Sequence, residues 1–368
     1  MSTLVYSSSP HVKSPRTTRR IMIDVCIALL PACIAGCVLL GLSNSKNGWL
    51  SLMILAISCL SAVASEFVYL LCCKKSFKDI LHEFDFTSLV TGLLVGMNMY
   101  PTSKWYAAIL ANVFAVVVVK MLFGGTGKNI VNPAIAGRIF AFIAFGAAFG
   151  GVMQFTNAYD KAIEVAGVSG GAIQAGATPV QSLFNSEISN SLTSLDLLLG
   201  TGVYGTIGEI CKVALIVGGI YLVIRGVLNF RWPLVYIAST GIVAVIIAWI
   251  DACKAQTGLN AGVAFYELGN AFSAFLPSIL SGGLILGAIF MATDYVTTPN
   301  TKLGNYVYFA LLGVLTAVLR RAVKGEAVSF AILLMNLLVP LFDRYIRRKP
   351  FGYVKPQKVK KSKQKEGE

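Results

Sequence analysis

The chain has 368 residues, of which 56% are hydrophobic and 13% are charged. Soluble domains carry roughly twice that share of charged residues, so the composition argues against a soluble protein and indicates a membrane protein. The net charge of +14 does not indicate a nucleic-acid partner, because ten of the 31 lysines and arginines lie in the polar tail 344–368. We expect that basic tail to lie in the cytoplasm against anionic lipid.

Ten hydrophobic segments follow one another along the chain. Several of them approach or exceed the roughly 20 apolar residues that a helix needs to cross a bilayer. The sequence therefore predicts an all-α polytopic membrane protein with about ten transmembrane segments. The first five are 21–42, 49–73, 87–100, 105–123 and 133–150, and the second five are 210–228, 232–251, 273–293, 305–320 and 326–343.

Basic residues predict the orientation of these segments. They gather in the N-terminal tail 1–20, at 74–78, at 225–231 and in the tail 344–368. Basic loops face the cytoplasm, and ten segments bring all four places to that side. We therefore expect an inner (plasma) membrane protein with both termini in the cytoplasm. One loop disagrees, because Arg320, Arg321 and Lys324 would then lie outside.

The segments divide into two membrane repeats, 21–150 and 210–343, joined by an external loop at 151–209. The pattern Gly-Leu-x-x-Gly at 92–96 returns at 283–287. Five segments per repeat make the second repeat inverted, an architecture whose ligand sites lie near the bilayer midplane on broken helices. The alternative explanation is that these glycines serve close packing between helices.

The stretch "FGGTGKNIVNPAIAGRIF" at 123–140 is the first candidate site. Its glycines, Gly125 among them, let the backbone approach a ligand closely. Asn132 before a proline predicts a helix start, and Asn129 can present a second amide to the same ligand. Arg138 stands in apolar surroundings, where a charge is expensive and is functional by default. The alternative is a simple turn and helix cap, with Arg138 reaching the membrane surface.

Two acidic residues next to hydrophobic segments are further candidates. Asp294 follows an apolar run directly, and it could accept a hydrogen bond from a ligand or pass a cation. Glu209, in "GTIGEI", opens the sixth segment. The simpler alternatives are an interfacial aspartate that begins a loop and a carboxylate that complements a helix N-terminus.

Several common chemistries lack their motifs. The chain has no Walker A sequence, no dinucleotide-binding glycine motif in a βαβ pattern, and no histidine or cysteine spacing typical of a metal site. The eight cysteines include no C-x-x-C pair, and we expect them to act mainly as small packing residues.

Six stretches, in this order, carry a family resemblance over nearly the whole chain. The chain resembles the D subunit of the Rnf complex, an ion-translocating ferredoxin:NAD oxidoreductase. It is more distantly similar to the B subunit of the sodium-translocating NADH:quinone oxidoreductase. The stretches are "SSSPHVKSPRTTRRIMIDVCIALLPA", "TGLLVGMNMYP", "FGGTGKNIVNPAIAGR", "GTIGE", "SGGLILGAIFMATDYVTTP" and "GEAVSFAILLMNLLVPLFDR".

The resemblance implies a covalently bound FMN. In this family a threonine in a Gly-Ala-Thr motif of the external loop carries FMN through a phosphoester bond, which a separate flavin transferase makes from FAD. The matching residues are Gly176, Ala177, Thr178 and Pro179. The family usually has an acidic residue six positions before the threonine and a serine or threonine three before. Here those positions hold Ala172 and Ala175.

The resemblance also implies a second, non-covalent flavin, riboflavin, within the membrane domain. Electrons would pass between the two flavins and so cross the membrane. Partner subunits of the complex would supply the iron–sulfur clusters, a further FMN and the NAD site. The residues expected to contribute to cofactor binding in the membrane domain are Gly125, Thr126, Asn129, Asn132, Arg138 and Asp294.

The sequence thus predicts a flavin-carrying subunit of a membrane redox pump that is not catalytic alone. Asp294 and Glu209 are the candidate residues for coupling to Na⁺ or H⁺. Two alternatives stay open: an inverted-repeat solute channel or transporter without a redox role, and a structural scaffold within the same complex. A purified transporter would be colourless, whereas the flavoprotein would be yellow.

Overall fold

The computed structural model of the chain describes residues 17–146, 194–200, 205–255, 272, 275–323 and 327–346. These residues form helices and turns, with no strand among them. The first half contains α1 (Thr18–Ser43), α2 (Ser45–Cys72), α3 (Phe77–Glu83), α4 (Thr87–Met97), α5 (Trp105–Val113), the π-helical segment η1 (Phe114–Met121) and α6 (Pro133–Ala144). Then come α9 (Ser194–Leu199), α10 (Lys212–Ile224), α11 (Arg231–Ala255), α13 (Phe275–Leu280), α14 (Leu284–Leu286), the π-helical segment η2 (Gly287–Met291), α15 (Lys302–Val323) and α16 (Ala327–Tyr345).

The helices confirm a multi-pass, all-helical membrane protein. Five are long and apolar enough to cross a bilayer, namely Thr18–Leu42, Ser45–Cys72, Arg231–Asp251, Lys302–Arg321 and Ala327–Tyr345. Each of the other predicted segments contains shorter helices, such as α4, α6 and α10. The count of ten spans and the inverted repeat therefore stay predictions.

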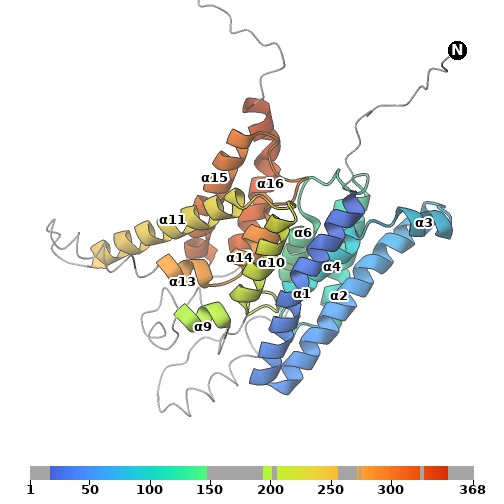
Figure 1. Cartoon of the computed structure of the whole chain (residues 1–368), viewed down its shortest axis with the longest axis horizontal. Coiled ribbons are helices and arrows are strands. Elements are labelled where there is room, and N and C mark those ends of the chain that lie inside the picture. Colours follow the sequence, from blue (N-terminus) through green and yellow to red (C-terminus); the bar gives the residue numbers. More distant parts are fainter. Residues whose placement is uncertain are drawn as a thin grey trace, which may run out of the picture.

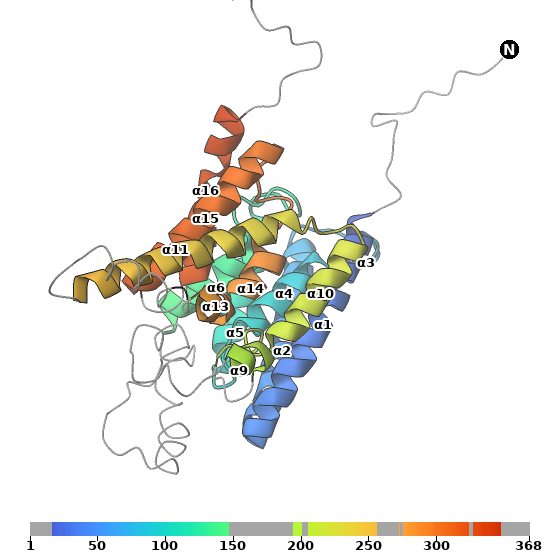
Figure 2. The ribbon, with the colours of Figure 1, turned by 60° about the vertical axis from the view of Figure 1, so that its left-hand side comes forward.

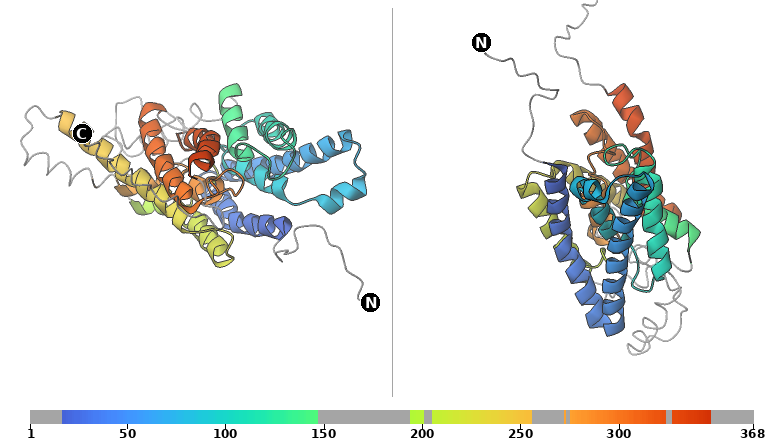
Figure 3. Two further views of the ribbon diagram at one scale, coloured as in Figure 1. Left: turned by 90° about the horizontal axis from the view of Figure 1, so that it is seen from above. Right: turned by 90° about the vertical axis from the view of Figure 1, so that its right-hand side faces the viewer.

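The two halves of the chain lie side by side (Figure 3, left). They meet where α10 packs on α1 and where α16 packs on α6. The start of α1 and the end of α16 lie at the same end of the molecule, and α9 lies toward the opposite end (Figure 1). The cytoplasmic placement of both termini stays a prediction. Turning the molecule shows α11 strongly inclined to α1 and α2 (Figure 2).

Glycines let α4 lie close against α2. A Cβ atom on Gly92 would stand 2.8 Å from the backbone oxygen of Ser58, closer than real contacts allow. The Ser58 hydroxyl donates to the Gly92 oxygen at 2.8 Å and accepts from the Asn112 amide at 2.7 Å. The packing explanation of the glycine pattern is therefore confirmed at Gly92, since a larger residue would separate the two helices.

Buried Arg320 accounts for one of the basic residues on the side predicted to be external. Helix α13 ends at Leu280, before the break that separates it from α14. Arg320, on α15, donates to the backbone oxygens of Ser278 at 2.5 Å and Ser281 at 3.0 Å. A cation at a helix C-terminus is stabilised by the helix dipole and by carbonyls without intrahelical partners. The neighbouring Arg321 pairs with Asp251 at 2.6 Å.

Replacing Arg320 by methionine should destabilise the chain. The variant leaves two carbonyl oxygens at the break without their charged donor, which should lower the free energy of unfolding by about 3 kcal/mol. Thermal unfolding in detergent measures the change. The matched control is Arg321→Met, whose half-exposed ion pair with Asp251 should contribute no more than about 1 kcal/mol. Equal destabilisation by the two variants would contradict the capping role of Arg320.

Candidate functional site

A pocket lies between the two halves of the chain. Helices α1 and α4 and the turn before α6 form one part of its wall, and the end of α10 and the segment η2 with the turn after it form the other. Most of its wall is apolar, including Met22, Val90, Leu94, Leu222 and Phe290. Pockets that bind small organic molecules combine apolar walls with a few polar groups that fix orientation. The polar or charged side chains on this wall belong to Thr87, Thr91, Lys120, Thr126, Asn129, Asn132, Thr293, Asp294 and Tyr295.

The turn between η1 and α6 depends on three glycines with positive φ. Gly124, Gly125 and Gly127 have φ angles of 108°, 89° and 88°, a region that other residues rarely adopt. Gly127 lines the pocket with Thr126. Gly125 is not part of the pocket wall, and its N–H donates to the oxygen of Lys120 at 3.1 Å. Gly125 therefore turns the chain, and its contribution to cofactor binding stays a prediction.

Asn132 begins α6, as the sequence predicts. Its side-chain oxygen accepts from the N–H of Ala134 at 3.0 Å, with Pro133 as the first helical residue. Its side-chain nitrogen donates to the backbone oxygen of Met291, the last residue of η2, at 3.0 Å. Asn132 thus holds two pocket elements together besides lining the pocket itself.

Asn129 and Asp294 come together on the same wall, although 165 residues separate them. The Asn129 amide donates to the oxygen of Val131 at 2.9 Å and also bonds the Asp294 carboxylate. Burial raises the pKa of the Asp294 carboxyl above its ordinary value, against the opposing effects of the Val296 N–H and the Asn129 amide. A buried carboxylate of this kind is stabilised when it takes up a proton or when a cation lies beside it.

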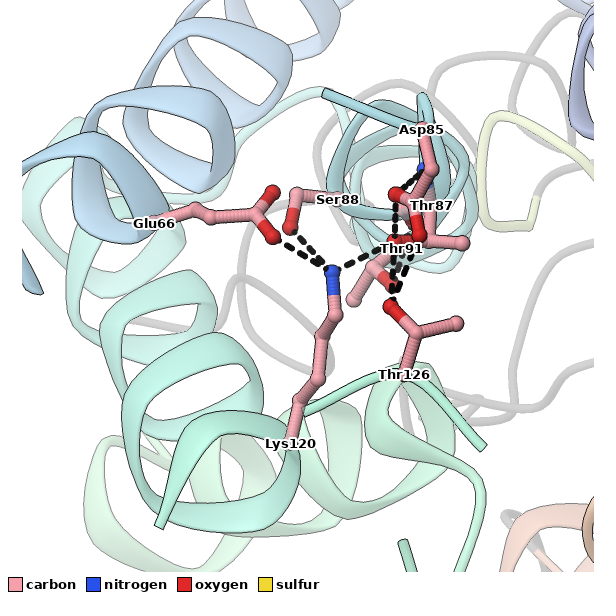
Figure 4. A network of polar contacts seen from close by, with 7 residues as sticks. All are labelled: Glu66, Asp85, Thr87, Ser88, Thr91, Lys120 and Thr126. Carbon is pink, nitrogen blue, oxygen red and sulfur yellow. Dashed lines mark hydrogen bonds and ion pairs between the residues drawn. The ribbon is translucent and has the colours of Figure 1, made fainter. Parts of the chain in front are cut away.

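A chain of polar side chains lies behind the threonines of the pocket wall (Figure 4). The ammonium of Lys120, on η1, donates to Glu66 Oε1 of α2 at 2.9 Å. It also donates to the hydroxyls of Thr87 at 2.5 Å and Ser88 at 3.0 Å. All three N–H bonds of the ammonium therefore have acceptors, so the wall holds a fixed positive charge.

Asp85 continues this chain toward the surface. It accepts from the hydroxyls of Thr87 at 2.5 Å and Thr126 at 2.9 Å. Burial raises the pKa of Asp85, but the Thr87 hydroxyl, the nearby Lys120 ammonium and Thr126 together hold it below its ordinary value. Asp85 is therefore an ionised carboxylate at neutral pH.

Glu66 and Asp85 lie near segment ends, and neither they nor Lys120 are among the candidate residues that the sequence patterns predict. The sequence does hold a sign of the Glu66–Lys120 pair. Each residue interrupts an apolar segment, where charged residues are costly and usually paired.

Arg138 lies in a second buried cluster and is not part of the pocket wall. It donates to Asn98 Oδ1 at 2.5 Å and to Glu209 Oε1 at 3.2 Å. Lys212 donates to the backbone oxygen of Glu209. A Cβ atom on Gly283 would stand 2.6 Å from Glu209 Oε1, so the carboxylate lies against the start of α14. This cluster joins α6 and the C-terminal end of α4 to the second half of the chain.

The structure thus brings Thr126, Asn129, Asn132 and Asp294 into one pocket and places Arg138 with Glu209 elsewhere. The predicted FMN residues Gly176, Ala177, Thr178 and Pro179, and also Ala172 and Ala175, lie outside the described residues. Within the described ranges, no group of three histidine, cysteine, aspartate or glutamate residues is arranged to hold a metal ion.

Comparison with known proteins matches residues 5–352 to the family described as NQR2, RnfD, RnfE. A relative in Acetobacterium woodii is 33% identical over 98% of both chains, and its name makes it the D subunit of a Na(+)-translocating ferredoxin:NAD(+) oxidoreductase complex. A relative in Clostridium ljungdahlii is 30% identical over 94% of this chain and 95% of its own, and its name makes it the D subunit of a proton-translocating complex of the same kind.

A third relative, in Alcanivorax borkumensis, is 28% identical over 95% of this chain and 97% of its own. Its name makes it the D subunit of an ion-translocating oxidoreductase complex. These matches run along nearly the whole chain and confirm the resemblance that the six sequence stretches indicated. The chain belongs to the NQR2, RnfD, RnfE family.

Proposed function

We propose that the chain is the flavin-carrying membrane subunit of an ion-translocating ferredoxin:NAD oxidoreductase complex. It passes electrons between a covalent FMN on Thr178 and a riboflavin in the pocket beside Asn129. The observation that carries the proposal is this pocket, with apolar walls and an amide–carboxylate edge, in a chain similar over its whole length to the D subunits of such complexes.

The side chains of the pocket suit a flavin without a phosphate. Apolar residues of α1, α4, α10 and η2 can cover the two faces of an aromatic ring system, and threonines and amides can meet its polar edge and hydroxyl groups. Lys120 is the one cation among the lining residues, and Glu66 already pairs with it. Asp294 would repel a phosphate. These charges favour riboflavin over FMN at this site.

Riboflavin supplies redox chemistry, because its ring system takes up and releases electrons. The residues of the chain bind and orient it. Asn132 holds the end of η2 against α6, and the apolar wall excludes water. Asn129 and Asp294 form a hydrogen-bonded edge that can hold or release a proton at the carboxylate.

Thr178 is the proposed attachment point for FMN. Its hydroxyl oxygen bonds to the phosphorus of the FMN half of FAD, the pyrophosphate bond breaks, and AMP leaves while the hydroxyl proton is released. A separate flavin transferase carries out this step. Partner subunits hold the iron–sulfur clusters and the NAD site, because the sequence has no motif for either.

Thr178→Ala should abolish covalent flavinylation. The wild-type chain should give a fluorescent band after denaturing electrophoresis and a Thr178 peptide with the added mass of FMN, and both should be lost in the variant. Thr156→Ala, in the same predicted external loop, is the control and should keep the band. Flavin bound to another residue, or a chain without covalent flavin, would refute the role of Thr178.

A tryptophan at Thr91 should displace the non-covalent flavin. The indole would fill the pocket, so the riboflavin released by denaturing the purified complex, separated by chromatography from the FMN of the partner subunits, should fall by about tenfold or more. The control is Val217→Trp, on the exposed face of α10, which should keep full flavin content. A wild-type chain that carries neither riboflavin nor covalent flavin would favour the transporter alternative, and full riboflavin content in Thr91→Trp would place the riboflavin outside this pocket.

Asp294→Asn should lower the number of ions moved per electron. The relatives' names give both Na(+) and proton as the translocated ion, so transport of both is measured in vesicles containing the complex. An amide keeps the size of the carboxylate but cannot neutralise a cation. The control is Asp79→Asn, which changes an exposed carboxylate on α3. An unchanged ratio of ions to electrons would exclude Asp294 from coupling.

A further inference from the structure

The ammonium of Lys120 is a fixed cation in the wall of the pocket. Its side chain is 3% exposed, and it reaches the wall from η1, one of two π-helical segments that line the pocket. The other is η2, through Ile289 and Phe290. π-Helical turns frequently occur at functional sites. Here η1 places a cation in the pocket wall, and η2 contributes apolar side chains to it.

The contacts of Lys120 hold its charge in place. Glu66, Thr87 and Ser88 accept its three N–H bonds, at 2.9, 2.5 and 3.0 Å. Its counterion is less well satisfied, since Glu66 Oε2 is buried and has no hydrogen-bond partner. A charge pair of this kind is expensive to bury in a membrane protein, so helix packing alone does not explain it.

The pair is asymmetric with respect to the pocket. Lys120 lines the pocket, whereas Glu66 is not part of its wall. In Figure 4, Glu66 and the threonines Thr87 and Thr126 lie on different sides of the ammonium. The nearer charge dominates in a weakly screening interior, so the pair as a whole adds a positive potential to a pocket that also faces two carboxylates, Asp294 in its wall and Asp85 behind Thr87.

We propose that Lys120 raises the reduction potential of the flavin in this pocket and that Glu66 limits the increase. The inference rests on the proposed riboflavin site. An electron that arrives from the reduced covalent FMN of the proposed function would add one negative charge to the pocket, and that FMN would be oxidised by one electron. The fixed ammonium stabilises that charge. The carboxylate behind it reduces the effect, so removing each group should move the potential in the opposite direction.

The test is a spectroelectrochemical titration of the purified complex, in which the riboflavin transition is the one that Thr91→Trp removes. Glu66→Gln keeps the ammonium but removes its counterion, so the potential should rise above that of the wild type. Lys120→Met with Glu66→Gln removes both charges without leaving a buried charge unpaired, so the potential should fall below the wild type. Each shift should reach at least a tenfold change in the reduction equilibrium, which is about 59 mV for one electron.

Two controls separate this electrostatic role from a structural one. Arg320→Met removes a buried charge that is not in the pocket wall and should leave the flavin potential unchanged. Flavin content, measured in every variant, reports whether the pocket stays intact. The order Glu66→Gln, wild type, double variant, from high to low potential, supports the inference, because loss of packing alone would not move the two variants in opposite directions.

Equal potentials in the wild type and both Lys120–Glu66 variants, with flavin bound, would overturn this inference alone. A wild-type complex without non-covalent flavin would overturn the proposed riboflavin site as well. A shift of both variants in the same direction would also contradict the opposed roles of Lys120 and Glu66.

Discussion

The side-chain amide of Asn132 is the contact on which the pocket depends. One end of the amide caps α6, and the other holds the last backbone oxygen of η2. The backbone N–H of Asn132 meets the side-chain amide of Asn336, on α16, at 3.1 Å. One residue of the first half therefore contacts two elements of the second half. Asn132 thus satisfies polar groups from several helices at once and holds the pocket walls at their spacing.

The need to satisfy buried polar groups within the protein also organises the buried charges. Lys120 is held by Glu66 and two hydroxyls, Arg138 by Asn98 and Glu209, and Arg320 by two carbonyl oxygens at a helix break. Each cation joins elements that are far apart in the sequence. These contacts are directional, so they fix how the helices pack more narrowly than apolar contacts between small residues can.

Local features of this chain could be predicted from the sequence, and long-range pairs could not. The start of α6 at Asn132–Pro133 and the glycine turn before it depend on neighbouring residues, so a short stretch specifies them. The pairing of Lys120 with Glu66 spans 54 positions, and the partner of Arg138 depends on where the segment with Glu209 crosses α4. The sequence identifies Asn129, Asn132 and Asp294 singly, but only packing shows that they share one wall.

Helix α4 is short for a membrane-spanning element. Its 11 residues extend about 16 Å at 1.5 Å per residue, about half of the roughly 30 Å hydrocarbon layer. The pocket touches its first turns, and Arg138 holds its C-terminal cap Asn98. A charge that moves along α4 therefore traverses at most about half of the membrane voltage drop. The electrical work for one elementary charge is then about 1 kcal/mol per 100 mV, so α4 alone cannot carry a charge across the whole membrane.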